Sequence, residues 1–190
     1  MDEFLHINKT FEKISYSDRK IGGREFDGCI FKNCDFSNSD FSGNIFIDCE
    51  FIDCNLAMIK LQNTSLKSVS FKLCKSLGVA FHECADFLFA VTFDQTMLDY
   101  SSFSNKKLQK TRFTACSMKE VNFAGADLSK SVFAECDLDN AIFNSTILNE
   151  ADFRSAYNYT IDPEINPMRK AKFSSAGIAG LLQKYDIKIV

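Results

Sequence analysis

The chain of 190 residues carries 25 acidic and 22 basic side chains, which gives a net charge of −3, and 46% of its residues are hydrophobic. Nucleic-acid-binding domains are normally basic, so direct nucleic-acid binding is not expected. No apolar run approaches the roughly 18 residues of a membrane helix, and the acidic start Met1-Asp2-Glu3 is unlike a signal peptide. We therefore expect one elongated cytoplasmic domain with no membrane partner.

The first segment, residues 1–20, is expected to be an N-terminal cap. A stack of repeats exposes its core and its unpaired backbone at an open end, so the end has to be covered. Phe11, Tyr16 and Ile21 already follow the spacing of the segment behind them.

The second segment, residues 21–157, repeats every five residues. A large apolar residue, here called the centre, recurs from Phe31 to Phe81 and from Phe93 to Phe153. With Phe87 in the gap there are 25 centres, of which 24 are Phe, Leu or Met and Ser76 is the exception. An amphipathic helix repeats at about 3.6 residues and a strand at about 2, so neither produces this pattern.

The position two residues before the centre is small. It is Ala, Cys, Ser, Thr or Val in 22 of the 25 repeats, the departures being Asn44, Ile59 and Lys106. Seven of the eight cysteines occupy it, and no short CxxC pair is present. We interpret the cysteines as reduced, inward-facing thiols and expect no metal site.

The repeat is disturbed at about residues 76–92. The centres Phe81, Phe87 and Phe93 are six residues apart, so two extra residues have to be accommodated by a bulge or a bend between two rod segments. Leu77 is expected to rotate inward in place of Ser76. Beyond Phe93 the centres alternate between Phe and Leu or Met.

The pentapeptides "CDFSN", "SDFSG", "ADLSK", "CDLDN" and "ADFRS" resemble the A(D/N)LXX motif of the pentapeptide repeat family. The resemblance implies an all-β fold, a right-handed quadrilateral parallel β-helix with four pentapeptides per coil and the centres pointing inward. Coils stack at about 4.8 Å, so about seven coils would form a rod on the order of 35 Å long. The alternation of centres would place Phe on two opposite faces.

The third segment, residues 158–190, is expected to hold a linker, a short helix and a strand for capping or dimerisation. Both prolines lie in "TIDPEINPMRK", which ends the repeat. An N-cap at Ser174 or Ser175 would start a helix through about Lys184, and a final strand would follow at 187–190. Gly177 and Gly180 cost about 1 kcal/mol each in an exposed helix, so packing rather than propensity should hold it.

Three stretches, "FKNCDFSNSDFSGNIFIDCEF", "SLGVAFHECADF" and "FSSAGIAGLLQKYDIKIV", resemble the Qnr-type quinolone-resistance branch of the family. The resemblance implies a homodimer formed through the C-terminal ends and a DNA-mimic surface that binds DNA gyrase or another topoisomerase, with consequences for antibiotic resistance. The implied dimer contacts are Phe173, Ile178, Leu181, Leu182 and Tyr185. The candidate DNA-mimic carboxylates near the dimer centre are Asp127, Glu135, Asp137, Asp139, Glu150 and Asp152. The two longer loops of that branch are absent from "CEFIDCNLAMIKL" and "AVTFDQTMLDYSSF".

Catalysis is not expected. His6 and His82 are isolated and are interpreted as surface or cap residues, and no glycine-rich phosphate loop occurs, so we assign no catalytic, cofactor-binding or metal residues and no cofactor. The alternative function is a protein-interaction scaffold with an unknown partner. Its docking face would use apolar residues one before the centre, such as Ile30, Ile45, Val132, Ile142 and Ile147.

Overall fold

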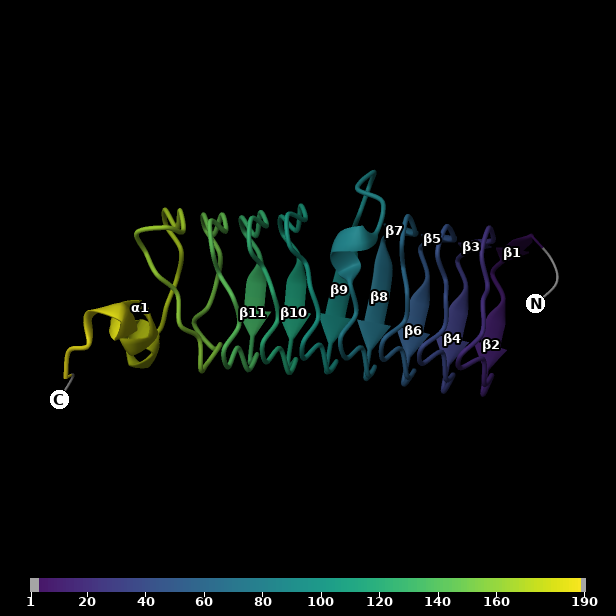
Figure 1. The fold of residues 1–190 in the computed structure, drawn as a ribbon, viewed down its shortest axis with the longest axis horizontal. Coiled ribbons are helices and arrows are strands. Elements are labelled where there is room, and N and C mark those ends of the chain that lie inside the picture. The colour runs from purple at the N-terminus through teal and green to yellow at the C-terminus, as the bar shows by residue number, and fades with distance from the viewer. Residues whose placement is uncertain (1–3, 189–190) are drawn as a thin grey trace.

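Each strand pairs in parallel with the strand one coil further along the chain, and this register builds the fold. Leu5 lies opposite Glu25, and His6 lies opposite Phe26. Because each side of a coil takes five residues, this spacing of twenty gives four sides. The computed structural model, which describes residues 4–188, is therefore an all-parallel β-solenoid with a short helix at its C-terminal end (Figure 1). The predicted fold class is confirmed.

We number the sides 1 to 4 in chain order by their inward-pointing centres. Side 1 holds His6, Phe26, Phe46, Leu66, Leu108, Leu128 and Leu148; side 2 holds Phe11, Phe31, Phe51, Phe71, Phe93, Phe113, Phe133, Phe153 and Phe173; side 3 holds Tyr16, Phe36, Leu56, Ser76, Leu98, Met118 and Leu138; side 4 holds Ile21, Phe41, Leu61, Phe81, Phe103, Phe123 and Phe143.

Sides 1 and 2 contain the strands. In the described part of the chain, side 1 forms a four-stranded sheet of β1 (Leu5–Ile7), β3 (Glu25–Asp27), β5 (Ile45–Ile47) and β7 (Ser65–Lys67). Side 2 forms, over the same residues, a seven-stranded sheet of β2 (Thr10–Glu12), β4 (Ile30–Lys32), β6 (Glu50–Ile52), β8 (Val69–Lys72), β9 (Val91–Asp94), β10 (Arg112–Thr114) and β11 (Val132–Ala134). Single parallel bridges, such as that of Asp35 with Asn55, link the coils on sides 3 and 4.

The core is a set of aromatic ladders. The Phe113 ring stacks between those of Phe93 and Phe133, with centroids 5.5 and 5.0 Å away, and meets the edge of Phe123 at 6.2 Å. Such pairs contribute about 0.5–1.5 kcal/mol each beyond area burial. From Phe93 onward Phe occupies the opposite sides 2 and 4, and Leu or Met occupies sides 1 and 3, which confirms the predicted alternation.

Small residues two before the centre connect successive coils. Thr64 Oγ1 donates a hydrogen bond to the Phe41 carbonyl at 2.8 Å, and Cys49 Sγ lies 3.3 Å from the Phe26 carbonyl. Asn44, a departure from the small-residue rule, does the same more extensively, because its Nδ2 donates to Ile21 O at 2.6 Å and to Phe41 O at 2.8 Å. The bonds to the carbonyls of Ile21, Phe26 and Phe41 from side chains 23 residues later link each coil to the one before it.

The corners depend on left-handed backbone. The residue two after a centre has a positive φ, for example 52° at Asn33, 63° at Lys110 and 55° at Glu120. Gly, Asn and Asp adopt this conformation most readily, whereas other residues pay roughly 1–2 kcal/mol. Each coil therefore stores backbone strain at its non-glycine corners, which the packing of the core has to offset.

The two extra residues of the disturbed region leave the coil as a loop. Val69 pairs with Val91, and the chain between them forms a 3₁₀ turn, η1 (Phe81–Glu83), and then loop 84–90, which projects from side 1 between β8 and β9 (Figure 1). The core continues past the loop, since Phe71 and Phe93 stack at 5.1 Å. Phe87 was wrongly counted as a centre, because its side chain is 73% exposed.

Ser76 remains at the inward position of side 3, contrary to the expected rotation of Leu77. Ser76 is fully buried and Leu77 is half-buried. The neighbouring Lys75 is bridged to both adjacent coils, and Ser76 N donates to Met97 O at 2.8 Å, so a one-residue rotation would break this register. The small side chain leaves a cavity of about 10 Å³ among the surrounding core side chains.

The N-terminal segment continues the repeat. From residue 4 onward the segment predicted as a cap pairs in register through β1 and β2 with the next coil. His6, expected at the surface, is instead buried at a centre position and stacks on Phe26 at 4.9 Å.

The C-terminal helix agrees with the sequence prediction, and the final strand does not. Helical turns run through η2 (Ala176–Ile178), α1 (Ala179–Leu182) and η3 (Gln183–Tyr185). Ser174 Oγ accepts a hydrogen bond from Gly177 N at 3.1 Å, as an N-cap would. Ile187 and Lys188 form no strand. Asp186, with a φ of 51°, turns the chain, and the two residues after it are exposed and have no strand beside them. Residues 189 and 190 lie outside the described residues.

The two helix glycines permit close contact with Tyr159. A Cβ at Gly177 would overlap the Tyr159 hydroxyl, and one at Gly180 would overlap the Tyr159 carbonyl. The contact is fixed by a hydrogen bond from Ile161 N to Gly180 O at 3.0 Å. The helix is therefore held by packing against the end of the rod, as its glycine content predicted.

Candidate protein-binding surfaces

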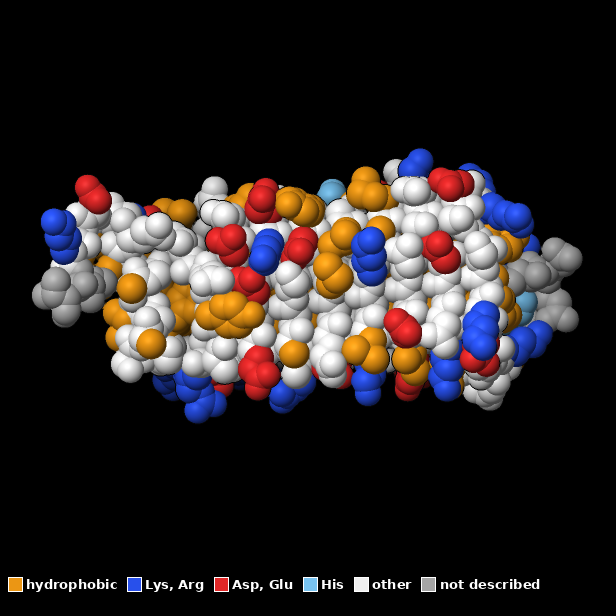
Figure 2. All heavy atoms as spheres, turned by 90° about the horizontal axis from the view of Figure 1, so that it is seen from below, with side chains coloured by type: hydrophobic (Ala, Val, Ile, Leu, Met, Phe, Trp, Pro, Cys, Tyr) orange, Lys and Arg blue, Asp and Glu red, His pale blue; other side chains and the backbone are white. Residues whose placement is uncertain are grey.

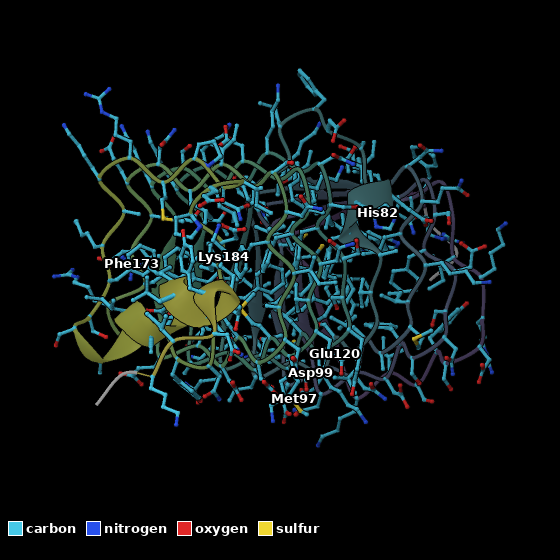
Figure 3. The ribbon with its side chains drawn as sticks, turned by 60° about the vertical axis from the view of Figure 1, so that its left-hand side comes forward. His82, Met97, Asp99, Glu120, Phe173 and Lys184 are labelled. Atoms are coloured by element: carbon cyan, nitrogen blue, oxygen red, sulfur yellow. The ribbon has the colours of Figure 1, made fainter. Side chains whose placement is uncertain are left out.

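The solenoid register gathers acidic side chains from different coils on side 3. Residues twenty apart in the sequence become neighbours in successive coils. Asp99, Lys119 and Asp139 therefore form one row along the rod, and Tyr100 and Glu120 form a second row beside it. Met97, Asp99 and Glu120 lie along the lower edge of the rod in Figure 3. We define the acidic surface as Asp99, Glu120, Asp137 and Asp139 of side 3 together with Glu135 at the corner between sides 2 and 3.

Two of these carboxylates are bound within the rod, and three are free. Asp99 Oδ1 accepts from Ser117 Oγ at 2.6 Å and from Lys119 N at 2.9 Å. Asp137 accepts from Asn158 Nδ2 at 2.8 Å and lies 3.5 Å from Lys119 Nζ.

Glu120, Glu135 and Asp139 are exposed, and none has a salt bridge to another described residue. Their charges are therefore available to a partner.

Apolar side chains accompany the acids. Met97, Tyr100 and Tyr157, which lie on the same side, are 46%, 63% and 51% exposed. Figure 2 shows the underside of the rod, where red acidic and orange apolar side chains gather left of the centre. Exposed tyrosine and methionine beside charged groups are typical of protein-binding surfaces.

The six carboxylates predicted from the sequence do not form one surface. Glu135, Asp137 and Asp139 belong to the acidic surface, whereas Asp127 lies on side 1, Asp152 on side 2 and Glu150 at the corner between them. Sequence reasoning missed Asp99 and Glu120. The period of twenty residues per coil could have identified them, because it places them beside Asp137 and Asp139 although they are distant in the chain.

The second group of acids is embedded among bases. Glu150 lies 3.7 Å from Lys130 Nζ, and Lys170 and Lys172 line the same groove. Arg154 donates to both oxygens of Asp152, at 2.7 Å from Nη2 and 3.0 Å from Nε, and these hydrogen bonds lower the pKa of that carboxyl. The charges of these acids are compensated within the protein.

Asp127 is also internally satisfied. Partial burial tends to raise the pKa of Asp127, but hydrogen bonds from Ser129 and Gln109 outweigh it and leave the pKa below its usual value. Ser129 Oγ donates to Oδ1 at 2.6 Å, and Gln109 Nε2 donates to Oδ2 at 2.7 Å. This carboxylate mainly stabilises a corner of the coil.

The five predicted dimer residues divide into two sets. Phe173 stacks on Phe153 at 5.3 Å, Leu181 contacts the core of its own chain, and Leu182 is half-buried. Ile178 and Tyr185 are 46% and 51% exposed. Phe173 and Leu181 therefore pack against the core at the end of the rod, whereas Ile178 and Tyr185 remain on the surface.

The five apolar positions considered for a scaffold do not share a face. Ile30 and Val132 lie on side 2, Ile45 and Ile147 on side 1, and Ile142 on side 4. Ile142 is 48% exposed and the other four are half-buried. A common docking face built from these positions is therefore not present.

Groups that could support chemistry are dispersed or buried. His82 is exposed on η1 (Figure 3), whereas His6 is buried in β1, in an earlier coil. All eight cysteines are buried, and burial raises the pKa of the Cys49 and Cys84 thiols to about 12.

Residues 4–188 contain no cluster of three or more His, Cys, Asp or Glu that would hold a metal ion. None of the helical segments between residues 4 and 188 reaches the length and apolarity that a bilayer crossing requires.

Comparison with known proteins gives the family. Residues 24–103 match the family model of the pentapeptide repeat region, and residues 116–154 match that of pentapeptide repeats in eight copies. No curated protein sequence matches.

Among solved structures, a trypsin-treated form of QnrB1, a plasmid-mediated fluoroquinolone resistance protein, has 20% identity and a TM-score of 0.48, covering 98% of this chain and 91% of its own. HetL from the cyanobacterium Nostoc sp. strain PCC 7120, involved in heterocyst differentiation regulation, has 16% identity and a TM-score of 0.46, covering 90% of this chain and 88% of its own. Together with the repeat register and the buried centres, the two family matches show that this chain belongs to the pentapeptide repeat proteins.

Proposed function

We propose that this protein is a non-catalytic binding rod whose acidic surface engages a basic surface of another protein. The observation that carries the proposal is the group of exposed carboxylates of Glu120, Glu135 and Asp139, which have no salt bridge among the described residues, beside Asp99 and Asp137. Such a field raises association rates and makes binding dependent on salt.

The density of charge is close to that of a nucleic-acid strand. The acidic surface has five acids and one lysine on three successive coils, which span about 14 Å at the usual strand spacing. This is one net negative charge per roughly 3.6 Å, which is comparable to one strand of DNA at about 3.4 Å and is half the density of the duplex at about 1.7 Å. The partner we favour is therefore a protein that holds duplex DNA, with DNA gyrase or another type II topoisomerase as the specific candidate and quinolone sensitivity as the property modulated.

Dimerisation through the C-terminal end would extend this surface. Ile178, Tyr185 and Ile187 are exposed at that end, and the acidic surface lies in the adjoining half of the rod. A homodimer joined there would place two acidic surfaces in one longer particle. Replacing Ile178 with Asp should yield monomers in sedimentation velocity, whereas Ile142→Asp on side 4 should not; a dimer that survives Ile178→Asp contradicts this assembly.

The test of the function is a supercoiling assay with purified gyrase, titrated with the protein with and without a quinolone at several salt concentrations. We expect inhibition or rescue that weakens as salt rises. The triple variant Glu120→Lys, Glu135→Lys, Asp139→Lys should lose the effect. The control variant Asp48→Lys, Glu83→Lys, Glu150→Lys changes the net charge equally and should retain it.

Equal behaviour of the two triple variants would refute the role of the acidic surface. A folded protein without any effect on gyrase, which captures a single different partner, would favour the scaffold function. The exposed Met97, Tyr100 and Tyr157 support that second candidate, because electrostatic mimicry of DNA has no need of them.

A further inference from the structure

Loop 84–90 is anchored by a buried lysine. Lys106 lies two residues before the side 1 centre Leu108, at a position that is small in most repeats of the chain, and its side chain is 3% exposed. Its Nζ donates to the Cys84 carbonyl, lies 2.6 Å from Asp86 Oδ1 and sits 5.0 Å from the centroid of the Phe89 ring. A buried ammonium is costly unless it is paired, so the loop supplies the partners that Lys106 needs.

Backbone hydrogen bonds fix both ends of the loop. Ala85 N donates to Thr64 O, and Ala90 N donates to Leu66 O, each at 2.9 Å. Phe89 N donates to Asp86 O at 3.3 Å within the loop. The loop is therefore an ordered projection of side 1.

Two large apolar side chains are exposed on this projection. Phe87 is 73% exposed and Leu88 is 62% exposed. Leu88 has a φ of 57°, the left-handed conformation that the corners of the coils also adopt. Two neighbouring apolar residues exposed on an ordered projection indicate a contact site, whereas single exposed apolar residues need no explanation.

A basic groove runs beside the loop. It has a volume of about 380 Å³ and is lined by Phe89, Ala90, Lys107 and Lys110 among others. Lys67 lies 5.6 Å from the Phe87 ring centroid on the other flank. Lys67, Lys107 and Lys110 have no salt bridge to any residue between 4 and 188, and Asp86 is already bound to Lys106.

We propose that the apolar tip of loop 84–90 and this basic groove bind an acidic peptide segment that carries apolar side chains. The charge of the groove selects acidic residues, and Phe87 with Leu88 provides the apolar contact. Loop 84–90 projects from side 1 at the top of the rod in Figure 1, whereas the acidic surface belongs mainly to side 3, with Asp99 and Glu120 at the lower edge in Figure 3. The site is thus independent of the proposed function, and one rod would bind two partners of opposite charge.

The test uses a fluorescent peptide of about ten residues in which Glu and Leu alternate, a length suited to a surface groove. Fluorescence anisotropy should show saturable binding to the full-length protein, weakening as salt rises. Phe87→Ser with Leu88→Ser, and separately Lys107→Glu with Lys110→Glu, should each weaken binding about tenfold or more. The matched controls Ile142→Ser and Lys13→Glu, both away from the loop, should bind as the parent does.

Other anionic partners are distinguished in the same assay. Vesicles of phosphatidylserine and phosphatidylcholine, and a single-stranded oligothymidine, are titrated alongside. The proposal is overturned if either of these binds while the peptide does not, or if the loop and groove variants bind the peptide as well as the controls. Lys106→Met should weaken peptide binding and speed amide exchange at Ala85 and Ala90. Lys106→Arg, which keeps the positive charge, should bind the peptide and exchange these amides more nearly as the parent protein does.

Discussion

Lys106 and Asp86 form an ion pair whose members have opposite surroundings. Nζ and Oδ1 are 2.6 Å apart, yet the Lys106 side chain is 3% exposed and that of Asp86 is 84% exposed. The burial cost of the pair therefore falls almost entirely on the lysine, while water already solvates the carboxylate. This asymmetry decides which substitution is more harmful.

Asp86→Asn should destabilise the protein more than Lys106→Met. The first change leaves a buried ammonium without its counter-ion and should cost about 1–2 kcal/mol, a range discounted for the exposure of Asp86. The second leaves the Cys84 carbonyl without this donor but also removes the buried charge, so its cost should lie near the lower end of the usual range, at about 1 kcal/mol. Urea unfolding of both variants checks the order, and a larger loss for Lys106→Met would contradict it.

The same substitution should have opposite effects at two buried serines. The Ser76 hydroxyl has no hydrogen-bond partner among the described residues, so Ser76→Ala should stabilise by about 1 kcal/mol. The single hydroxyl hydrogen of Ser39 has an acceptor within reach, since Oγ lies 2.7 Å from Phe36 O and 2.9 Å from Tyr16 O, so Ser39→Ala should destabilise by about 1 kcal/mol. Thermal unfolding measures both, and shifts of equal sign would show that the cavity beside Ser76 dominates.

Gly180→Ala should release the C-terminal helix from the rod. Alanine favours a helix by about 1 kcal/mol, but here its Cβ would overlap the Tyr159 carbonyl, and overpacking typically costs about 1–3 kcal/mol. Amide exchange over residues 176–185 should accelerate. Ala179→Gly, which lowers helix propensity without a clash, is the control and should accelerate exchange less. If Ala179→Gly had the larger effect, helix propensity rather than the contact with Tyr159 would hold the helix in place.

The cysteines should be unreactive in the folded protein. All eight thiols are buried, so a reagent cannot reach them while the coils stay closed. Burial also raises the pKa of Cys49 and Cys84 to about 12, which keeps the reactive thiolate of these two residues scarce near neutral pH. A colorimetric thiol reagent should detect few thiols at pH 8 and all eight after denaturation. Rapid labelling of the native protein would mean that the coils open far more often than the packing implies.

Docking of the C-terminal helix should weaken in acid. Hydrogen bonds from Lys184 lower the pKa of Asp162 and of Glu164, with Nζ to oxygen distances of 2.6 and 2.7 Å. A lowered carboxyl pKa stabilises the folded form above the unfolded value and loses this effect as pH falls through the folded value, here below about pH 4. Amide exchange of the helix against pH should show the transition, and Lys184→Met should abolish it.

The sequence predicted the core well because the repeat encodes it directly. Each side of a coil has one inward residue, so the positions of Phe113 and Leu128 followed from the period of five alone. The corner role of the cysteines followed from their place two residues earlier. The left-handed residue two after each centre was not predicted, although the many Asn, Asp and Gly residues there carried the signal.

The surfaces were harder to predict because they depend on the register between coils. Acids were grouped by their nearness in sequence, which joined Asp152 to Asp137 although the two lie on different sides. Phe87 is of the residue type expected at a centre. The sign that it lies outside the coil was Lys106, a large charged residue one coil later at a position that is usually small. The rotation expected of Leu77 failed because backbone bonds to both neighbouring coils hold Ser76 in place.

The looped-out segment at 84–90 also keeps the two halves of the rod in phase. If the two additional residues were part of the coil, every later residue would be displaced around the coil relative to its partner in the coil before. Phe93 would then no longer stack on Phe71, and the aromatic ladder would end there. Because the loop takes up the two additional residues, Met97 still pairs with Lys75 of the preceding coil. A pentapeptide rod can thus gain a projection without losing the alignment of its coils.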